Sequence, residues 1–214
     1  MPRLSSGSIL IEPSSLTLNT SLKLMEYLRG QVNTIKVLYR PGTANILIHG
    51  RVVALALAPF TVIIDKGDAN ELAALVERYG RVYVLAGDTW LDYVEISIEE
   101  LLALLQALSN LSEVCTRSLC VTFTTMSGCE RIVIADERLV YVAGLLGHKS
   151  TGIELSNLPQ DRNVYAYCEV QGSRYPVVEA LSWEDGKASY KVRVALEVVD
   201  VIQWILVGLL ISAD

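Results

Sequence analysis

Apolar and polar positions alternate along the chain in two rhythms, one helical and one extended. Helical spacing predicts a first helix over 20–29, with Asn19 or Thr20 as its N-cap and Gly30 at its end. The same signals predict helices over 71–80 and 98–112. The final segment, to residue 212, is apolar on all sides, which is typical of a helix that is deeply buried or lies in a subunit interface.

Short runs rich in Val, Ile and Tyr, separated by turns that contain Gly, Pro or Asp, predict strands. We expect them at 34–40, 44–49, 51–58, 61–65, 81–87, 118–126, 130–135, 138–145, 164–170, 174–183 and 187–198. The order of elements predicts an α+β fold of mostly antiparallel meander sheets with helices packed on one face. We expect two domains, residues 1–97 and residues 98–214, the second ending in the apolar helix.

Two segments, 37–57 and 121–145, share a pattern that indicates an internal duplication. In each, a Gly turn lies four residues before an I-x-I strand, which begins at Ile46 in the first segment and at Ile132 in the second. Each segment also follows a predicted amphipathic helix. Such self-similarity favours two domains of related topology, and a chance likeness between Val- and Ile-rich hairpins stays open as the alternative.

The segment from Gly42 to Ala56 reads G-x-x-x-I-x-I-x-G-R-V-V-A-L-A and is followed by ELAALVERYGRVYVL. Across residues 16–105 this pattern resembles a small regulatory domain found at the N-terminus of many bacterial response regulators and in uncharacterised archaeal proteins. The resemblance implies a three-stranded meander followed by a helix and a strand, in a binding or regulatory module. That family has no catalytic residues to carry over, and this chain departs from its pattern at Asp65-Lys66-Gly67, where the loop is longer.

Composition and charge narrow the class of protein. Of the 214 residues, 51% are hydrophobic and 20% charged, so a folded core is expected. The net charge of −6 disfavours generic binding to polyanions. The apolar run 201–212 is shorter than the roughly 20 residues that span a bilayer, and the N-terminus lacks a secretion signal. We therefore expect a cytoplasmic protein, and the aliphatic composition with Tyr favoured over Phe is typical of a thermophile.

The stretch VAGLLGHKSTG, residues 142–152, is the first candidate for chemistry. With Lys149 and Ser150 in the register of a phosphate-binding loop, His148 and Ala143 occupy the positions where that loop needs glycine. The stretch is therefore interpreted as a surface loop.

The four cysteines offer no zinc-binding spacing, because four, eight and 38 residues separate Cys115, Cys120, Cys129 and Cys168. The chain has only two histidines, His49 and His148. We expect no metal and no cofactor. The cysteines are interpreted as small buried residues, or as a source of a disulfide such as Cys115–Cys129.

Because no catalytic constellation is recognisable, the sequence favours a non-enzymatic protein–protein interaction or regulatory module that self-associates. The apolar C-terminal helix supplies the expected interface, through Trp204, Ile205, Leu209 and Leu210. The alternative is a nucleic-acid-binding protein with a basic patch in residues 29–51, formed by Arg29, Lys36, Arg40 and Arg51. An enzyme with a site particular to its fold stays open as a third interpretation.

Overall fold

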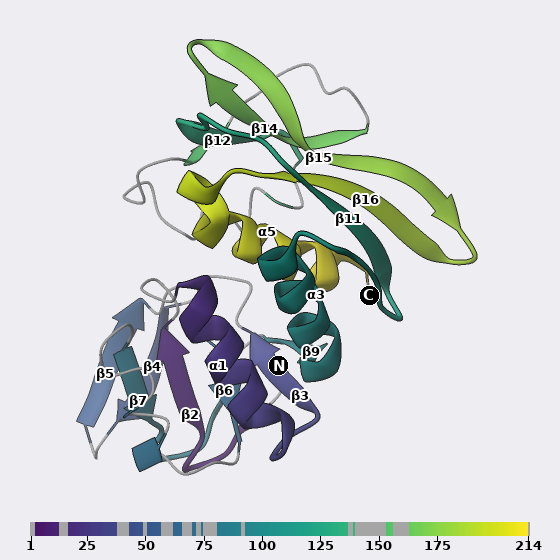
Figure 1. Cartoon of the computed structure of the whole chain (residues 1–214). Coiled ribbons are helices and arrows are strands. Elements are labelled where there is room, and N and C mark those ends of the chain that lie inside the picture. Colours follow the sequence, from purple (N-terminus) through teal and green to yellow (C-terminus); the bar gives the residue numbers. More distant parts are fainter. Residues whose placement is uncertain are drawn as a thin grey trace. The chain divides into compact units, whose positions relative to one another are not determined.

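The chain forms two compact units, Met1–Glu99 and Glu100–Asp214, in a computed structural model (Figure 1). We call them unit 1 and unit 2. The structure describes residues 3–12, 17–37, 43–48, 51–56, 62–65, 70, 71, 74, 81–90, 93–136, 139, 153–155 and 163–213. Both units combine helices with sheets that are mostly antiparallel, so the fold class is α+β, as the sequence predicted.

Unit 1 is built around a five-stranded antiparallel sheet of order β7-β2-β6-β3-β9. Its members are β2 (Ile9–Glu12), β3 (Thr34–Val37), β6 (Val62–Ile64), β7 (Arg81–Val84) and β9 (Val94–Ser97). Two further antiparallel pairs are β4 (Thr43–Ile48) with β5 (Arg51–Ala56), and β1 (Arg3–Leu4) with β8 (Thr89–Trp90). The helix α1 (Leu18–Arg29) belongs to this unit, and Asn70, Glu71 and Ala74 are also helical.

Apolar residues of the strands and of α1 form the core of unit 1. Ile35 and Val37 of β3 are each 1% exposed, and α1 buries Leu24 and Leu28. The helix begins after Thr17, whose hydroxyl accepts a hydrogen bond from the backbone N–H of Thr20 at 3.3 Å. The predicted N-cap, residue 19 or 20, is therefore wrong, because both positions lie inside the first helical turn.

Unit 2 contains a seven-stranded sheet of order β10-β11-β16-β15-β14-β12-β13. Its strands are β10 (Glu113–Cys115), β11 (Leu119–Thr125), β12 (Arg131–Ile134), β13 (Ile153–Leu155), β14 (Val164–Val170), β15 (Ser173–Glu184) and β16 (Lys187–Val194). The pairs β11–β16 and β12–β13 are parallel, and the other four are antiparallel. The helices α3 (Ile98–Asn110) and α5 (Val199–Ala213) lie on the same side of this sheet (Figure 1).

The strand β16, between β11 and β15, contributes every second residue to the unit 2 core. Its burial alternates along the whole strand, with Ala188, Tyr190, Val192 and Val194 buried and the residues between them half-buried. This period of two is the pattern of a sheet with one face packed against helices. A short 3-10 turn, η2 (Leu196–Val198), connects β16 to α5.

Several expectations about individual elements need correction. The strand β2 lies between β7 and β6 in the unit 1 sheet and was not predicted. It contains the continuous apolar run Ile9–Ile11, which shows no alternation. The strand β13 lies between the strands expected at 138–145 and 164–170, where no strand was predicted. Of the strand predicted over 138–145, Leu139 is described, and it lies in a helical turn instead.

The duplication is not confirmed by the pairing of the strands. In the first segment β4 and β5 pair with each other, whereas in the second β12 pairs with β13 and β14. The counterpart of β5 in the second segment falls largely outside the described residues. The internal repeat stays a prediction.

Candidate functional site

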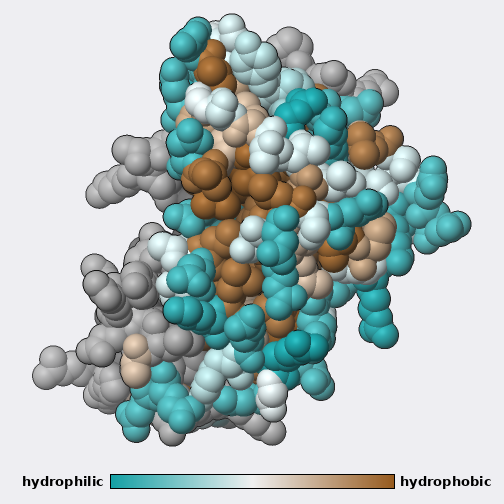
Figure 2. Space-filling view, viewed as in Figure 1, coloured by the Kyte–Doolittle hydropathy of each residue, from teal (hydrophilic) through white to brown (hydrophobic). Residues whose placement is uncertain are grey.

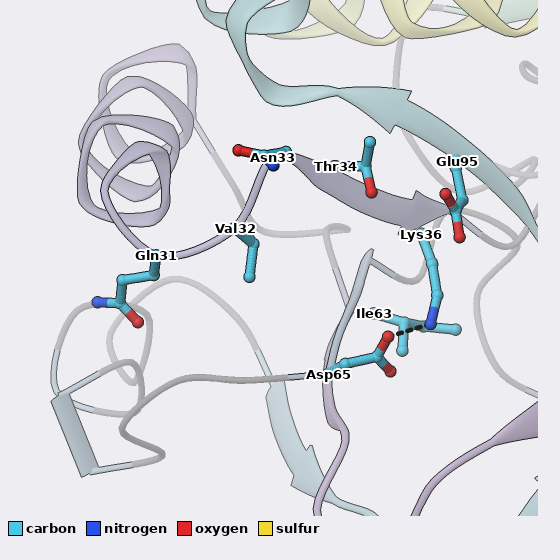
Figure 3. A pocket seen from close by; sticks show the side chains of 8 residues that line it. All are labelled: Gln31, Val32, Asn33, Thr34, Lys36, Ile63, Asp65 and Glu95. Atoms are coloured by element: carbon cyan, nitrogen blue, oxygen red, sulfur yellow. Dashed lines mark hydrogen bonds and ion pairs between the residues drawn. The ribbon is translucent and has the colours of Figure 1, made fainter.

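A polar pocket of about 320 Å³ opens beside β3 in unit 1. Lys36 pairs in register with Ile63 on one neighbouring strand and with Glu95 on the other, so the three side chains share one face of the sheet. Asp65 lies two residues beyond Ile63. Figure 3 shows Lys36 extending from β3 to Asp65, with Gln31 on the opposite side of the pocket.

The Lys36 ammonium is the positive charge among the residues that line this pocket. It forms an ion pair with Asp65 and lies 5.0 Å from the ring centroid of Tyr93. The buried Ser8 hydroxyl lies 3.2 Å from the other carboxylate oxygen of Asp65. Burial acts to lower the pKa of Lys36, but the hydrogen bond and charge of Asp65, with Tyr93 and Glu95, outweigh burial and raise this pKa above 10.5.

This raised pKa limits what the pocket can do chemically. A catalytic lysine must lose its proton to act as a nucleophile or as a base, and Lys36 keeps its proton at neutral pH. The nearby carboxylates, Asp65 and Glu95, outnumber this one ammonium. The pocket is therefore a polar cavity with a neutralised cation, and this geometry supplies no activated nucleophile and no attraction for phosphate.

The predicted basic patch is only partly within the described residues. Arg29 forms an ion pair with Glu99, with an N–O distance of 2.7 Å, and Lys36 is held as described above. Arg40 lies outside the described residues, and of Arg51 only the backbone, at the start of β5, is described. Since both described cations are held by carboxylates, this surface offers weakened attraction to a phosphate backbone, and the nucleic-acid alternative stays a prediction.

The predicted interface residues of the C-terminal helix are buried within the chain. Trp204, Ile205, Leu209 and Leu210 are 8%, 1%, 1% and 3% exposed. Of the two settings expected for an all-round apolar helix, the structure has deep burial, and the interface role of these residues stays a prediction. Apolar residues gather over α5 in the view of Figure 2.

The same helix meets the length and composition criteria for a membrane span. The helical stretch Leu196–Ala213 has 18 residues with a mean hydropathy of 1.9, and 56% of it is buried. It is longer than the apolar run 201–212 that the sequence indicated, because the helical stretch begins at Leu196. A buried core helix meets these criteria as well.

A different apolar surface is exposed at the far end of β15. Leu181 is 59% exposed and Trp183 is 69% exposed. The register of β15 against β16 shifts between Ala180 and Ser182, so Leu181 lies in a β-bulge. Two residues with positive φ, Asp185 at 52° and Gly186 at 77°, form the turn that joins the strands. We call Leu181 and Trp183 the β15 tip.

The β15 tip was not predicted from the sequence. The sequence did contain a signal. Two apolar residues, Leu181 and Trp183, directly precede the turn residues EDG, and the end of a hairpin usually lies outside the core. Alternation alone could not reveal this, because β15 has buried residues at adjacent positions, Val177 and Val178.

The remaining candidates for chemistry do not form a site in the described part of the chain. All four cysteines are joined in disulfides, Cys115–Cys120 and Cys129–Cys168, so the suggested Cys115–Cys129 pairing is wrong. Within the described ranges no group of three or more His, Cys, Asp or Glu residues is placed to hold a metal ion. Both histidines and the stretch 142–152 lie outside those ranges.

Comparisons with known proteins add no family to this description. No protein-family model, no curated protein and no solved structure matches the chain. The resemblance of residues 16–105 to the regulatory domain of response regulators therefore stays a prediction.

Proposed function

We propose that this chain is a non-enzymatic protein-interaction module that self-associates through the β15 tip. The observation that carries the proposal is the exposure of Leu181 and Trp183, at 59% and 69%. Tryptophan is enriched among the few residues that supply most of the binding free energy of an interface. A polar border around exposed apolar side chains is typical of such sites, and Figure 2 shows hydrophilic residues at the outer end of the β15–β16 hairpin.

A second copy of the chain is the partner that the charges favour. From residue 179 to residue 193, the hairpin carries three acidic and three basic residues: Glu179, Glu184 and Asp185, and Lys187, Lys191 and Arg193. Two identical copies of this surface therefore meet without net repulsion, although the whole chain carries a net charge of −6. An acidic or basic partner would gain no electrostatic attraction from this hairpin.

The size of the β15 tip sets the strength of the expected dimer. Two exposed side chains from each copy bring together on the order of 500 Å² of surface. A standard stable interface buries at least about 1,200 Å². We therefore expect a reversible dimer with a dissociation constant in the micromolar range.

Sedimentation velocity over a concentration series from about 1 to 100 µM tests this proposal. The wild-type chain should show a weight-average sedimentation coefficient that rises with concentration. Trp183→Ala and Leu181→Ser should each lower the association constant at least tenfold, since burial of these side chains supplies most of the apolar contact.

The matched control is Trp90→Ala. Trp90 is 60% exposed, nearly as much as Trp183, but lies in β8 of unit 1. This variant should associate as the wild type does. A wild-type chain that stays monomeric across the series, or equal loss of association in all three variants, would overturn the proposal.

Two further properties belong to the same proposal. The resemblance to a regulatory domain in residues 16–105 favours a regulatory role for unit 1. The composition favours a cytoplasmic protein of a thermophile, where intracellular disulfides are known.

A further inference from the structure

The two disulfides differ in how a reagent reaches them. Cys115 and Cys120 face each other across β10 and β11, five residues apart in the chain, and Cys115 is exposed while Cys120 is half-buried. Cys129 and Cys168 are 39 residues apart and only 4% and 0% exposed. A thiolate in solution can therefore reach the first pair in the folded chain, whereas the second pair requires an opening of the core.

The disulfide Cys115–Cys120 joins the edge of a sheet to its neighbour. The strand β10 is the edge strand of the seven-stranded sheet, and among the described residues it pairs there with β11 alone. Cys115 is its last residue, and the exposed residue Arg117 follows in the turn. An extended segment of another molecule can approach this edge without displacing a strand.

Hydrogen bonds hold the turn between these cysteines without help from the disulfide. The backbone N–H and the hydroxyl of Thr116 donate to the carbonyl of Leu119 at 2.8 and 3.1 Å. The backbone N–H of Ser118 donates to the carboxylate of Glu100 in α3 at 2.9 Å. The two strands therefore stay paired when the S–S bond opens, and the cysteine Cα atoms, 4.1 Å apart in the disulfide, stay close enough to reclose it.

We propose that Cys115–Cys120 is a redox-active site that exchanges with external dithiols, while Cys129–Cys168 is a permanent crosslink. A thiolate of the dithiol attacks one cysteine sulfur, forms a mixed disulfide and releases the other cysteine as a thiolate. The second thiol of the partner then attacks the mixed disulfide and releases the first cysteine. Two electrons and two protons pass to the chain, which holds two thiols, and the partner leaves as a disulfide.

Timed reduction of the native chain by dithiothreitol, stopped by alkylation and read by peptide mass spectrometry, tests the proposal. Cys115 and Cys120 should be alkylated together and more than about 100-fold faster than the buried pair, because the buried pair waits for an opening whose free energy approaches that of global unfolding. Removal of the reductant and addition of oxidised glutathione should restore the Cys115–Cys120 pairing. Equal rates for both pairs, or reduction of Cys115–Cys120 only in denaturant, would overturn the proposal.

A positioning role for the turn is tested by Thr116→Val, with Thr122→Val on β11 as the matched control. Both replacements remove one hydroxyl, but only the first removes turn hydrogen bonds. Reclosure of the reduced pair by oxidised glutathione should slow several-fold in Thr116→Val and stay unchanged in Thr122→Val. Reclosure at the wild-type rate in both variants would contradict the role of the turn. This result is independent of self-association, which involves other residues.

Discussion

The disulfide Cys129–Cys168 should stabilise unit 2 more than Cys115–Cys120 does, because it restricts a longer stretch of the unfolded chain. The pairs are separated by 39 and by 5 residues. Loop closure over these separations contributes about 4 kcal/mol for the first and about 2 kcal/mol for the second at 25 °C. Both cysteines of the first pair are also buried, so their loss removes core contacts as well.

Urea unfolding of two double variants tests this difference. Replacing Cys129 and Cys168 with Ala should lower the free energy of unfolding of unit 2 by about 4 kcal/mol, and replacing Cys115 and Cys120 with Ala should lower it by about 2 kcal/mol. Both pairs lie in the same unit, so one transition serves for the comparison. An equal or larger loss in the Cys115 and Cys120 variant would refute the loop-closure reasoning.

Three further experiments probe local contacts. Asp65→Asn should lower the pKa of Lys36, followed by NMR titration, because it removes the carboxylate charge and leaves a weaker, neutral acceptor for the ammonium. In the wild type, this pair's stabilisation is present up to pH 10.5 and is lost as the pH rises through the raised pKa, and an unchanged titration would contradict this. Gly186→Ala should lower the free energy of unfolding, measured by thermal unfolding, by about 1 kcal/mol, because Gly186 has a φ of 77°, which is unfavourable for alanine. An unchanged melting temperature would contradict this. A double-mutant cycle on Arg131 and Glu169, which meet in two hydrogen bonds of 2.9 Å, should give a coupling of about 0.5–1 kcal/mol that falls with salt, whereas zero coupling would show that the pair contributes nothing.

Elements with a clear period were predictable from the sequence, and elements set by long-range pairing were not. The strand β14 is bounded by turn residues and was expected at its observed bounds. The strand β16 alternates strictly and begins where it was expected, but it ends at Val194, and the turn η2 replaces the end of the predicted range 187–198. The strand β2 has no alternation of apolar and polar residues, because it is an interior strand whose residues Ile9, Leu10 and Ile11 are all buried. The parallel pairing of β11 with β16 joins segments about 70 residues apart, which no local pattern encodes.

The candidate site was harder to predict, because its properties come from neighbours in space. Lys36 looked like part of a basic patch, but Asp65, directly after β6, pairs with it, and Glu95 lies opposite it on β9. Trp204 was expected at an interface or in a deeply buried helix, and its burial depends on elements far away in the sequence. Trp183 looked like an ordinary strand residue. Its exposure depends on which other elements pack against the end of β15, and a local pattern does not show this.

The fluorescence of Trp183 tests the central claim of self-association most directly. A Trp90→Phe variant keeps Trp183, which is 69% exposed, and the buried Trp204, which provides a constant background. As the concentration rises from about 1 to 100 µM, the emission should shift to shorter wavelength, because Trp183 leaves water at the interface between two copies. The shift should vanish when Leu181→Ser is added. An emission maximum that stays unchanged over this range would contradict the account.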